Sequence, residues 1–363
     1  ILAERAAALG VPIRRGVAGT GFDADDTGVT VRTDRGELRA AWLVGCDGGR
    51  STVRKVAGFE FPGTPPEITG HQAVVELRGA ERLGRGWQTT PTGIYAHGPV
   101  PGRILTVEFD GPPADRDAPI TAAELEKSLR AVSGVDVEVT AVHTATRFTD
   151  NARQATTYRL GRVLLAGDAA HVHSPFGGQG LNLGIGDAVN LGWKLAATVR
   201  GRAPEGLLDT YTAERHPIAA WVLDWTRAQI AVMRPDTHAR ALRAVVEDLI
   251  ATPTGTTHFA KMISGVWHRL DLPGTHPLIG RSAPDLVLSD GSRLSDHLHD
   301  GRGLLLDLGG VQSSVDGRDP HRLTTTCPTH PDLPGLLVRP DGVVAWAGGD
   351  DLDTAITTWF GTC

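Results

Sequence analysis

One stretch, residues 161–197 with the sequence GRVLLAGDAAHVHSPFGGQGLNLGIGDAVNLGWKLAA, restricts the fold of this chain more than any other. It opens with an apolar run at 163–166, which is typical of a buried strand and ends at Gly167 and Asp168. A loop rich in glycine follows at 174–180. From there the apolar residues recur mostly three or four positions apart, which predicts an amphipathic helix. Strand, loop and helix in this order indicate an α/β domain.

This order of elements also predicts a ligand site. In open α/β sheets, ligands bind beyond the carboxyl ends of the strands. The first N–H groups of a helix have no acceptor within the helix, and they carry a partial positive charge. We therefore expect the carboxylate of Asp168 and the amides of Gly180, Leu181 and Asn182 to face one polar ligand.

A second strand-and-turn motif lies nearer the start of the chain. A short apolar run leads into Asp47 and Gly48, and a helix is expected soon after them. Arg50, Ser51 and Arg54 follow closely and offer partners for a phosphate or pyrophosphate. Asp and Gly also favour ordinary turns for local reasons, so a purely structural role for this motif stays open.

Between the two motifs the pattern changes to that of β-strands. Strands are expected at 71–77, 93–96 and 103–109, separated by turns that contain proline and glycine. One helix is expected at 121–132, because Thr121 can cap it and Glu124 follows at the spacing of a capping box. This texture predicts an antiparallel sheet inserted between two parts of the α/β domain.

The inserted sheet could form the floor of a substrate pocket. Among its aromatic residues, Trp87 and Tyr95 are candidates to line that pocket. Aromatic side chains on strands more often serve ordinary packing, so this alternative stays open for each of them.

The last third of the chain reads as helices followed by a separate small unit. Helices are expected from about 209 to 230 and from 237 to 250. From about 277 onward, a buried strand at 303–308, a hairpin at 336–346 and a closing helix at 354–360 suit a small α/β domain of thioredoxin type. The absence of a Cys-x-x-Cys pair gives no support to thiol redox chemistry.

Composition excludes several other classes of function. A net charge of −6 with mixed signs gives no reason to expect nucleic acid or an anionic membrane as partner. The sequence has no apolar run of roughly 18 to 20 residues, the length that spans a bilayer. Three cysteines are too few for a disulfide framework, which favours a cytoplasmic setting. His171 and His173 have only Asp168 nearby as a third metal ligand, so a metal site is not expected.

Taken together, the motifs resemble a known family. The segments GCDGGRSTVRK and GDAAHVHSPFGGQGLNLGIGDAVNLGWKLA resemble the two internal fingerprints of the class A flavin-dependent aromatic monooxygenases. More narrowly, the chain resembles the branch with the aromatic polyketide hydroxylases and rifampicin monooxygenases, which have a thioredoxin-like C-terminal domain. The resemblance covers nearly the whole chain, including the RPDGVVAWAG tail.

This resemblance implies a fold with four segments. Residues 1–57 and 151–275 would form a Rossmann-like FAD-binding domain, 58–150 the substrate-binding β-sheet domain and 276–363 the thioredoxin-like domain. It also implies FAD as cofactor. By this resemblance Asp168, next to Gly167, binds the ribityl chain of FAD, while Pro175 and the glycine loop around Gly178 lie along the isoalloxazine. The amides of Gly180, Leu181 and Asn182 meet the N1/C2-carbonyl edge of the ring.

The resemblance implies a reaction as well. Asp47 and Gly48 are associated with the pyrophosphate region and with the approach of the nicotinamide cofactor. NADPH or NADH reduces FAD, molecular oxygen forms a flavin C4a-hydroperoxide, and one oxygen atom passes to an aromatic small-molecule substrate. No catalytic triad is expected, because the cofactor performs the chemistry. The oligomeric state is left open, with a homodimer as one candidate.

Two departures from the family pattern keep alternatives open. The family begins with a strand and a Gly-x-Gly-x-x-Gly loop that hold the ADP half of FAD, and this chain has no such loop after a strand, so residues upstream of Ile1 are expected to be missing. Phe176 stands where relatives often have a smaller residue, which would narrow the substrate side of the pocket. The alternatives are a catalytically inactive remnant or small-molecule binding module and, less favoured, a nicotinamide-dependent dehydrogenase.

Overall fold

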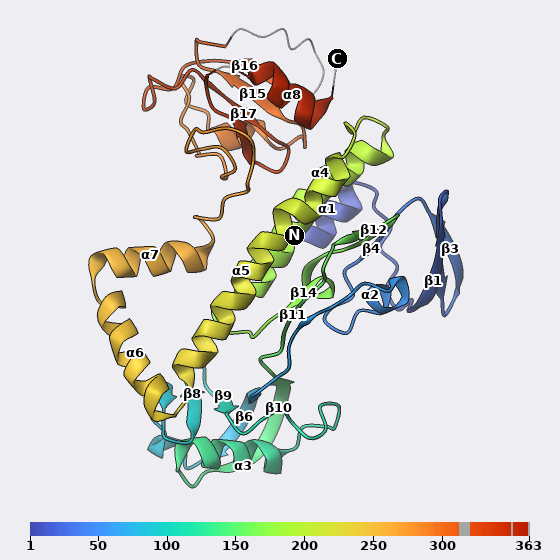
Figure 1. Cartoon of the computed structure of the whole chain (residues 1–363). Helices are drawn as coiled ribbons and strands as arrows, with labels where there is room; N and C mark the ends of the chain where they lie inside the picture. The colour runs from blue at the N-terminus through green and yellow to red at the C-terminus, as the bar shows by residue number, and fades with distance from the viewer. Residues whose placement is uncertain (312–319, 350, 362–363) are drawn as a thin grey trace.

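The computed structural model describes residues 1–311, 320–349 and 351–361. Two long helices, α4 (Gly180–Val199) and α5 (Thr210–Met233), pack against each other at the centre of the molecule. In Figure 1 the C-terminal domain lies beyond one end of this pair, and an antiparallel sheet with helix α3 (Ala122–Ser133) lies at the other end. The strands that continue into the predicted ligand site lie between these two units.

The α/β domain is built around a pair of parallel strands. Strand β13 (Val163–Leu165) is fully buried and pairs in parallel with β4 (Leu43–Gly45). On its other side β13 pairs antiparallel with β12 (Arg159–Leu160). Parallel neighbours need a long connection between them. Here that connection includes the whole inserted sheet, which confirms the predicted insertion into an α/β domain.

Shorter elements complete the first part of the chain. Helix α1 (Leu2–Ala8) precedes a three-stranded antiparallel sheet of β1 (Gly19–Asp25), β2 (Gly28–Thr33) and β3 (Gly36–Ala40). Helix α2 (Thr52–Ala57) follows β4. A further small sheet joins β5 (Gly63–Thr64), β11 (Ala152–Gln154) and β14 (His171–Val172). Because β5 pairs with β11, residues near 63 belong with the α/β strands, and the inserted sheet begins after them; the division into four segments stays a prediction.

The inserted sheet has five antiparallel strands in the order β10-β6-β9-β8-β7. Helix α3 covers one face, where Leu125 and Leu129 pack with residues such as Ile104. The opposite face presents Ile94 and Val107 toward the loop before α4 and toward α5. The strands are β6 (Thr69–Arg78), β7 (Gly86–Thr89), β8 (Gly93–His97), β9 (Arg103–Glu108) and β10 (Glu138–Phe148).

Half of the predicted capping box forms at the start of α3. The hydroxyl of Thr121 accepts a hydrogen bond from the N–H of Glu124 at 3.1 Å, as expected. The carboxylate of Glu124 does not turn back to Thr121. It accepts hydrogen bonds from Arg147 at 2.6 Å and from the buried ring of His71 at 2.8 Å. Glu124 therefore ties α3 to the sheet, because an ionic partner is available there.

Two further helices extend from α5, and then the C-terminal domain begins. Helix α6 (Thr237–Ile250) lies where the sequence predicts it, and α7 (Pro253–Ser264) was not predicted. The C-terminal sheet has the order β16-β15-β17-β18, with β15 parallel to β16 and the other pairs antiparallel. Its elements are β15 (Leu304–Asp307), β16 (His321–Thr324), β17 (Gly335–Val338), β18 (Val344–Trp346) and helix α8 (Leu352–Phe360). The predicted strand, hairpin and closing helix are confirmed; the thioredoxin-like assignment stays a prediction, and Cys363 lies outside the described residues.

A cluster of buried charges joins the C-terminal domain to α4 and α5. Arg339, from the turn after β17, donates two parallel hydrogen bonds to the carboxylate of Glu214 on α5, at 2.9 and 2.8 Å. Lys194 on α4 lies 2.9 Å from the same carboxylate. Asp341 accepts a hydrogen bond from Nε of Arg339 at 3.1 Å, and the amide of Asn190 donates to Glu214 at 2.7 Å. We call these five residues the domain-interface cluster.

None of the helices in the described ranges is both long and apolar enough to cross a membrane.

Candidate functional site

The two predicted motifs meet at one edge of the α/β sheet. In the parallel pair, Leu43 lies opposite Val163 and Gly45 lies opposite Leu165. Both strands therefore end at the same edge, and each runs directly into its motif. The turn at Asp47 and the turn at Asp168 are thus neighbours in the fold, although 121 positions separate them in the sequence (168 − 47).

The carboxylate of Asp47 is hydrogen-bonded to the start of helix α2. It accepts hydrogen bonds from the hydroxyl of Ser51 at 2.6 Å and from the N–H groups of Thr52 at 2.7 Å and Val53 at 3.0 Å. Burial alone would raise the pKa of Asp47, but these hydrogen bonds hold it below the ordinary value. The structural alternative for this residue therefore has direct support. Its association with the pyrophosphate and nicotinamide groups, and that of Gly48, stays a prediction.

Arg54 links the two motifs instead of binding a phosphate. Its side chain is buried and donates to the carbonyl of Ala169 and to the carbonyl of Gly49, both at 2.8 Å. The guanidinium also lies over the ring of Phe61, 3.7 Å from its centre. The sequence-based expectation of a free phosphate partner is wrong here, because the loops on both sides present unpaired carbonyl oxygens that a buried cation can satisfy.

The other two expected phosphate partners are also engaged. Ser51 is buried, and its hydroxyl caps α2 by accepting from the N–H of Arg54 at 2.9 Å. Arg50 forms an ion pair with Asp117 at 2.5 Å. The Ser51 hydroxyl is thus used within the protein, whereas Arg50 is exposed in a surface ion pair, so a role of Arg50 as a phosphate partner stays a prediction.

A pocket of about 660 Å³ opens beside the second motif. Its walls come from the turn after β13, from the glycine loop and from the first turns of α4. The pocket contains six of the nine predicted cofactor-binding residues: Gly167, Asp168, Pro175, Gly178, Gly180 and Leu181. The remaining three, Asp47, Gly48 and Asn182, are not part of its wall. Residues that were not predicted to bind the cofactor complete it: Val172, His173, Gly184, Ile185 and Ala188.

The start of α4 offers free N–H groups to this pocket. Gln179 precedes the helix and provides no side-chain cap. The first hydrogen bond of the helix joins the N–H of Leu183 to the carbonyl of Gln179, at 2.9 Å. The amides of Gly180, Leu181 and Asn182 come before that bond and thus remain for a ligand, where the helix dipole favours negative charge. That these amides face one ligand together with Asp168 stays a prediction.

Asp168 has an exposed carboxylate that makes no hydrogen bond or ion pair with the residues the structure describes. Its position depends on Gly167, whose φ of +61° is unfavourable for other residues. A Cβ on Gly184 would stand 3.4 Å from the Cα of Gly167, so the turn and the helix approach each other closely there. The result is an unpaired carboxylate held at the rim of the pocket.

A buried ionic network, centred on Asp187, supports this turn from behind. Asp187 is fully buried and accepts hydrogen bonds from His171 at 2.7 Å, from Arg215 at 2.8 Å and from the N–H of Gly167 at 3.0 Å. Burial would raise the pKa of Asp187, but the hydrogen bond and charge of His171 and the charge of Arg215 lower it. The local sequence pattern did not predict this network. The buried face of α4 includes the polar residues Asp187 and Lys194, whereas the apolar residue Leu181 is exposed, so apolar spacing could not show that Asp187 is buried.

His173 lines the pocket, and its ring has one nitrogen engaged. Nδ1 lies 2.7 Å from the carbonyl of Ser174. Burial lowers the pKa of His173, which favours the neutral ring at neutral pH. Because a carbonyl can only accept, Nδ1 carries the proton in the neutral ring and Nε2 is an acceptor. His171 and His173 thus turn to different partners, and the described part of the chain holds no group of three side chains that could bind a metal.

Several buried polar atoms near the pocket have no partner among the described residues. They are the hydroxyl of Ser174, Oε1 of Gln179 and Nδ1 of His171. Buried polar atoms are almost always hydrogen-bonded in folded proteins, to protein or to water. The loop before α4 therefore has unused hydrogen-bonding capacity, as expected of a segment that contacts a polar ligand.

The three predicted substrate-pocket residues do not stay together. Phe176 is buried against the inserted sheet, with its ring 5.9 Å from that of Phe148 and 6.2 Å from that of Trp87. Trp87 remains 60% exposed. Tyr95 points to the other face of the sheet, where it packs in the core beneath α3 and its hydroxyl accepts from the N–H of Gly84 at 3.0 Å. Tyr95 therefore does not lie on the face of the sheet that contacts Phe176, because successive residues of a strand face opposite sides.

Comparison with known proteins decides the family. Residues 1–226 match the model of an FAD binding domain, and residues 276–363 match that of the C-terminal region of aromatic-ring hydroxylases. The chain belongs to the FAD-dependent aromatic-ring monooxygenases. FAD is therefore the cofactor of this family, and the resemblance found in the two fingerprints is confirmed.

Individual relatives agree with this assignment. The chain is 45% identical over 370 residues to a rifampicin monooxygenase of Streptomyces venezuelae, covering 99% of this chain and 77% of the relative. It is 40% identical over 374 residues to a dialkyldecalin synthase of Streptomyces rugosporus, again covering 99% of this chain and 77% of the relative. The solved structure of the OxyS anhydrotetracycline hydroxylase from Streptomyces rimosus superposes with a TM-score of 0.89 at 42% identity, covering 99% of this chain and 78% of that one.

Proposed function

We propose that this protein is an FAD-dependent monooxygenase that consumes NADPH or NADH and hydroxylates an aromatic polyketide-type or antibiotic substrate. The observation that carries the proposal is the pocket at the start of α4. There Asp168, whose carboxylate has no partner among the described residues, lines one pocket with Gly180 and Leu181 at the uncapped start of a helix, in a chain of the aromatic-ring hydroxylase family. The names of its relatives support the substrate class, since they include rifampicin and anhydrotetracycline monooxygenases.

The residues of the pocket fit the flavin half of FAD. Asp168 would accept a hydrogen bond from a hydroxyl of the ribityl chain, as a free carboxylate at the rim can do. Pro175 and Gly178 would lie along the ring, because neither places a long side chain in the pocket. The amides of α4 would meet the N1/C2-carbonyl edge. When bound, FAD supplies hydride acceptance and the activation of molecular oxygen.

The protein itself supplies electrostatics, position and a place for a proton. With FAD bound, the positive end of α4 would stabilise negative charge at the ring edge, and it would need no reorganisation to do so. The network of Asp187, His171 and Arg215 holds the turn that carries Asp168. His173, neutral at neutral pH with Nε2 free to accept, can hold a proton in the pocket wall. Phe176 and Trp87 would contribute an aromatic wall on the substrate side.

The experiment that tests this proposal combines flavin binding with oxygen transfer. The purified chain is incubated with FAD and separated from free flavin, and its visible spectrum is recorded. NADPH and NADH oxidation is then followed with anhydrotetracycline or rifampicin under isotopically labelled oxygen. We expect a bound flavin spectrum, faster nicotinamide oxidation with substrate and a product that contains one labelled oxygen atom.

Two other outcomes would contradict the proposal. A protein that stays colourless with FAD would favour the binding-module alternative. Bound flavin with a product that is an isomer of the substrate would indicate the kind of reaction named for another relative structure, a Diels-Alderase that is 38% identical with a TM-score of 0.87. Homodimer formation and a cytoplasmic setting stay predictions.

A further inference from the structure

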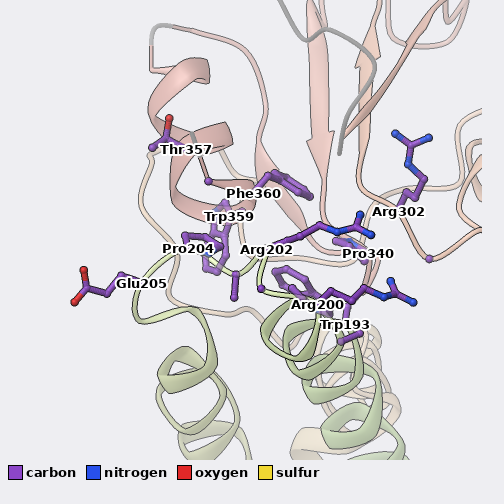
Figure 2. A pocket seen from close by; sticks show the side chains of 16 residues that line it. Trp193, Arg200, Arg202, Pro204, Glu205, Arg302, Pro340, Thr357, Trp359 and Phe360 are labelled. Atoms are coloured by element: carbon purple, nitrogen blue, oxygen red, sulfur yellow. The ribbon is translucent and has the colours of Figure 1, made fainter. Parts of the chain in front are cut away.

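A second cavity, of about 820 Å³, lies where the C-terminal domain meets the end of α4 (Figure 2). Its size falls within the range of about 300–1,000 Å³ that is typical of small-molecule sites. Trp193 and Arg200 border it from the last turns of α4, Arg202 from the following loop, and Pro340, Trp359 and Phe360 from the C-terminal domain. Trp193 lies 13 residues after Gly180 (193 − 180), or roughly 20 Å along the helix from the proposed flavin site.

The cavity is locally positive, in contrast to the whole chain with its net charge of −6. Arg200 and Arg202 make no ion pair and no side-chain hydrogen bond with residues in the described ranges. In Figure 2 their side chains extend in the same direction, whereas Glu205, the one acidic residue among the described residues of the wall, lies on the other side of the cavity. Unpaired guanidinium groups at a cavity recognise carboxylates and phosphates through planar, paired hydrogen bonds.

The aromatic residues of the wall are held in place from inside the protein. The guanidinium of Arg339, in the domain-interface cluster, lies 5.4 Å from the ring centre of Trp193 and 4.3 Å from that of Trp359. These contacts, together with the burial of Trp359, fix the indole rings before any ligand arrives. Phe360 adds a third ring on the side of the C-terminal domain. A wall of fixed rings favours flat aromatic ligands over flexible aliphatic ones.

We propose that this cavity binds a planar aromatic anion, that is, a ring system that carries a carboxylate or a phosphate. The rings of Trp193, Trp359 and Phe360 would contact the ring system, and Arg200 and Arg202 would bind the anionic group. This site is separate from the proposed flavin pocket and does not depend on the proposed reaction. Aromatic carboxylates and nucleotides share this chemistry, and the test separates them.

The test is a calorimetric titration of the FAD complex after free flavin has been removed, so that the flavin pocket is occupied and no excess FAD competes for the second cavity. The probes are naphthoate and adenosine monophosphate. Cyclohexanecarboxylate, which lacks the aromatic ring, and naphthalenemethanol, which lacks the charge, are the controls. We expect at least one aromatic anion to bind saturably and about tenfold or more tightly than both controls, a difference of about 1.4 kcal/mol. Binding of naphthoate alone would assign the aromatic carboxylate class, and binding of adenosine monophosphate the nucleotide class. Failure of both, or equal binding of a control, would overturn the proposal.

Substitutions then locate the binding. The double variant Arg200→Gln with Arg202→Gln is expected to weaken binding of the aromatic anion by about tenfold or more, because it removes both anion-binding groups. Both side chains are exposed, so the melting temperature should change little. Arg103→Gln is the matched control, an exposed arginine on the inserted sheet, and should bind the anion like the wild type. A double variant with wild-type affinity would place the ligand elsewhere and refute the site. FAD affinity, measured separately, should be the same in all three proteins.

Discussion

The two ends of helix α4 use polar groups in opposite ways. At its end, Lys194 and Asn190 are buried in the domain-interface cluster, where both contact the carboxylate of Glu214. At its start, the amides of the first turn have no acceptor within the helix, and the nearby carboxylate of Asp168 has no partner in the part of the chain that the structure describes. One helix thus has polar groups with hydrogen-bond partners at its end and polar groups without such partners at its start.

This difference separates stability from binding. Polar groups that are paired and buried inside the protein contribute to the folded state only, and removing one partner leaves the other buried without compensation. Polar groups that are unpaired and open to a pocket cost little when removed, unless a ligand uses them. Substitutions at the end of α4 should therefore change the free energy of unfolding, and substitutions at its start should change the affinity for FAD.

The largest effect is expected from Arg339→Met. This change removes the bidentate contact to Glu214 and leaves the buried carboxylate groups of Glu214 and Asp341 with Lys194 as the one remaining cation of the domain-interface cluster. Breaking a buried ion pair in this way typically costs about 3–5 kcal/mol. Urea denaturation of the FAD-free protein measures the loss. Arg103→Met, at an exposed site, is the control and should stay within about 0.5 kcal/mol of the wild type. A loss below about 1 kcal/mol for Arg339→Met would show that the cluster is not a stabilising unit.

The second-largest effect is expected from low pH, which should lower the stability that the domain-interface cluster contributes. Burial would raise the pKa of Glu214, but the hydrogen bond and charge of Arg339 and the charge of Lys194 lower it from 4.5 to about 2. A lowered pKa contributes stability that is fully present above pH 4.5 and is lost as the pH falls toward 2, here about 3 kcal/mol. The unfolding free energy, measured across that range, should converge for the wild type and Glu214→Gln. Glu205→Gln, at an exposed site, should keep the wild-type pH dependence. Parallel curves for the wild type and Glu214→Gln would contradict the assignment.

At the start of α4, Asp168→Asn should act on binding and not on folding. A hydrogen bond to a charged group contributes about 1.5–3 kcal/mol, so FAD affinity should fall by roughly ten- to a hundredfold. The free energy of unfolding without FAD should change by no more than about 0.5 kcal/mol, because the carboxylate is exposed. Asp332→Asn, an exposed aspartate of the C-terminal domain, is the matched control. Equal FAD affinity in the two variants would remove Asp168 from the cofactor site.

The sequence predicted those features that a local pattern encodes. The apolar run before Gly167 and the spacing after Gly180 define β13 and α4, and the loop between them places the pocket. The strand alternation predicted the inserted sheet, but it could not tell which face meets α3. For that reason Tyr95 could be named only as a candidate for the pocket, and it packs on the face beneath α3.

Contacts between residues far apart in the sequence could not be predicted from such local patterns. Arg339 and Glu214 are 125 positions apart, and nothing in either local sequence names the other as a partner. Arg54 looked like a phosphate ligand because a short-range motif cannot show the carbonyl of Ala169, 115 positions away, that it satisfies. The same holds for Asp187, since neither its burial nor its contacts with His171 and Arg215 follow from the apolar spacing of α4.

The smallest effect is expected from Lys194→Met, although Lys194 is as deeply buried as Arg339. Burial lowers the pKa of Lys194 to about 8, despite the opposing charge of Glu214. Burial of the charged ammonium group of Lys194 therefore costs free energy. In the variant, Glu214 keeps its bidentate contact to Arg339. Exchange of a buried charge for an apolar side chain of similar length should therefore change the unfolding free energy at pH 7 by only about 1 kcal/mol or less.

The change of the unfolding free energy with pH tests whether burial lowers the pKa of Lys194. Between pH 8 and 10.5 the unfolded wild type binds a proton at Lys194 that the folded protein has released, so wild-type stability should rise with pH in that window. Lys194→Met lacks the group and should lack this part of the rise. Urea denaturation at several pH values measures both curves. If Lys194→Met cost as much as Arg339→Met at pH 7, the ammonium would be an equal partner in the cluster, and Arg339 and Glu214 could not be its main pair.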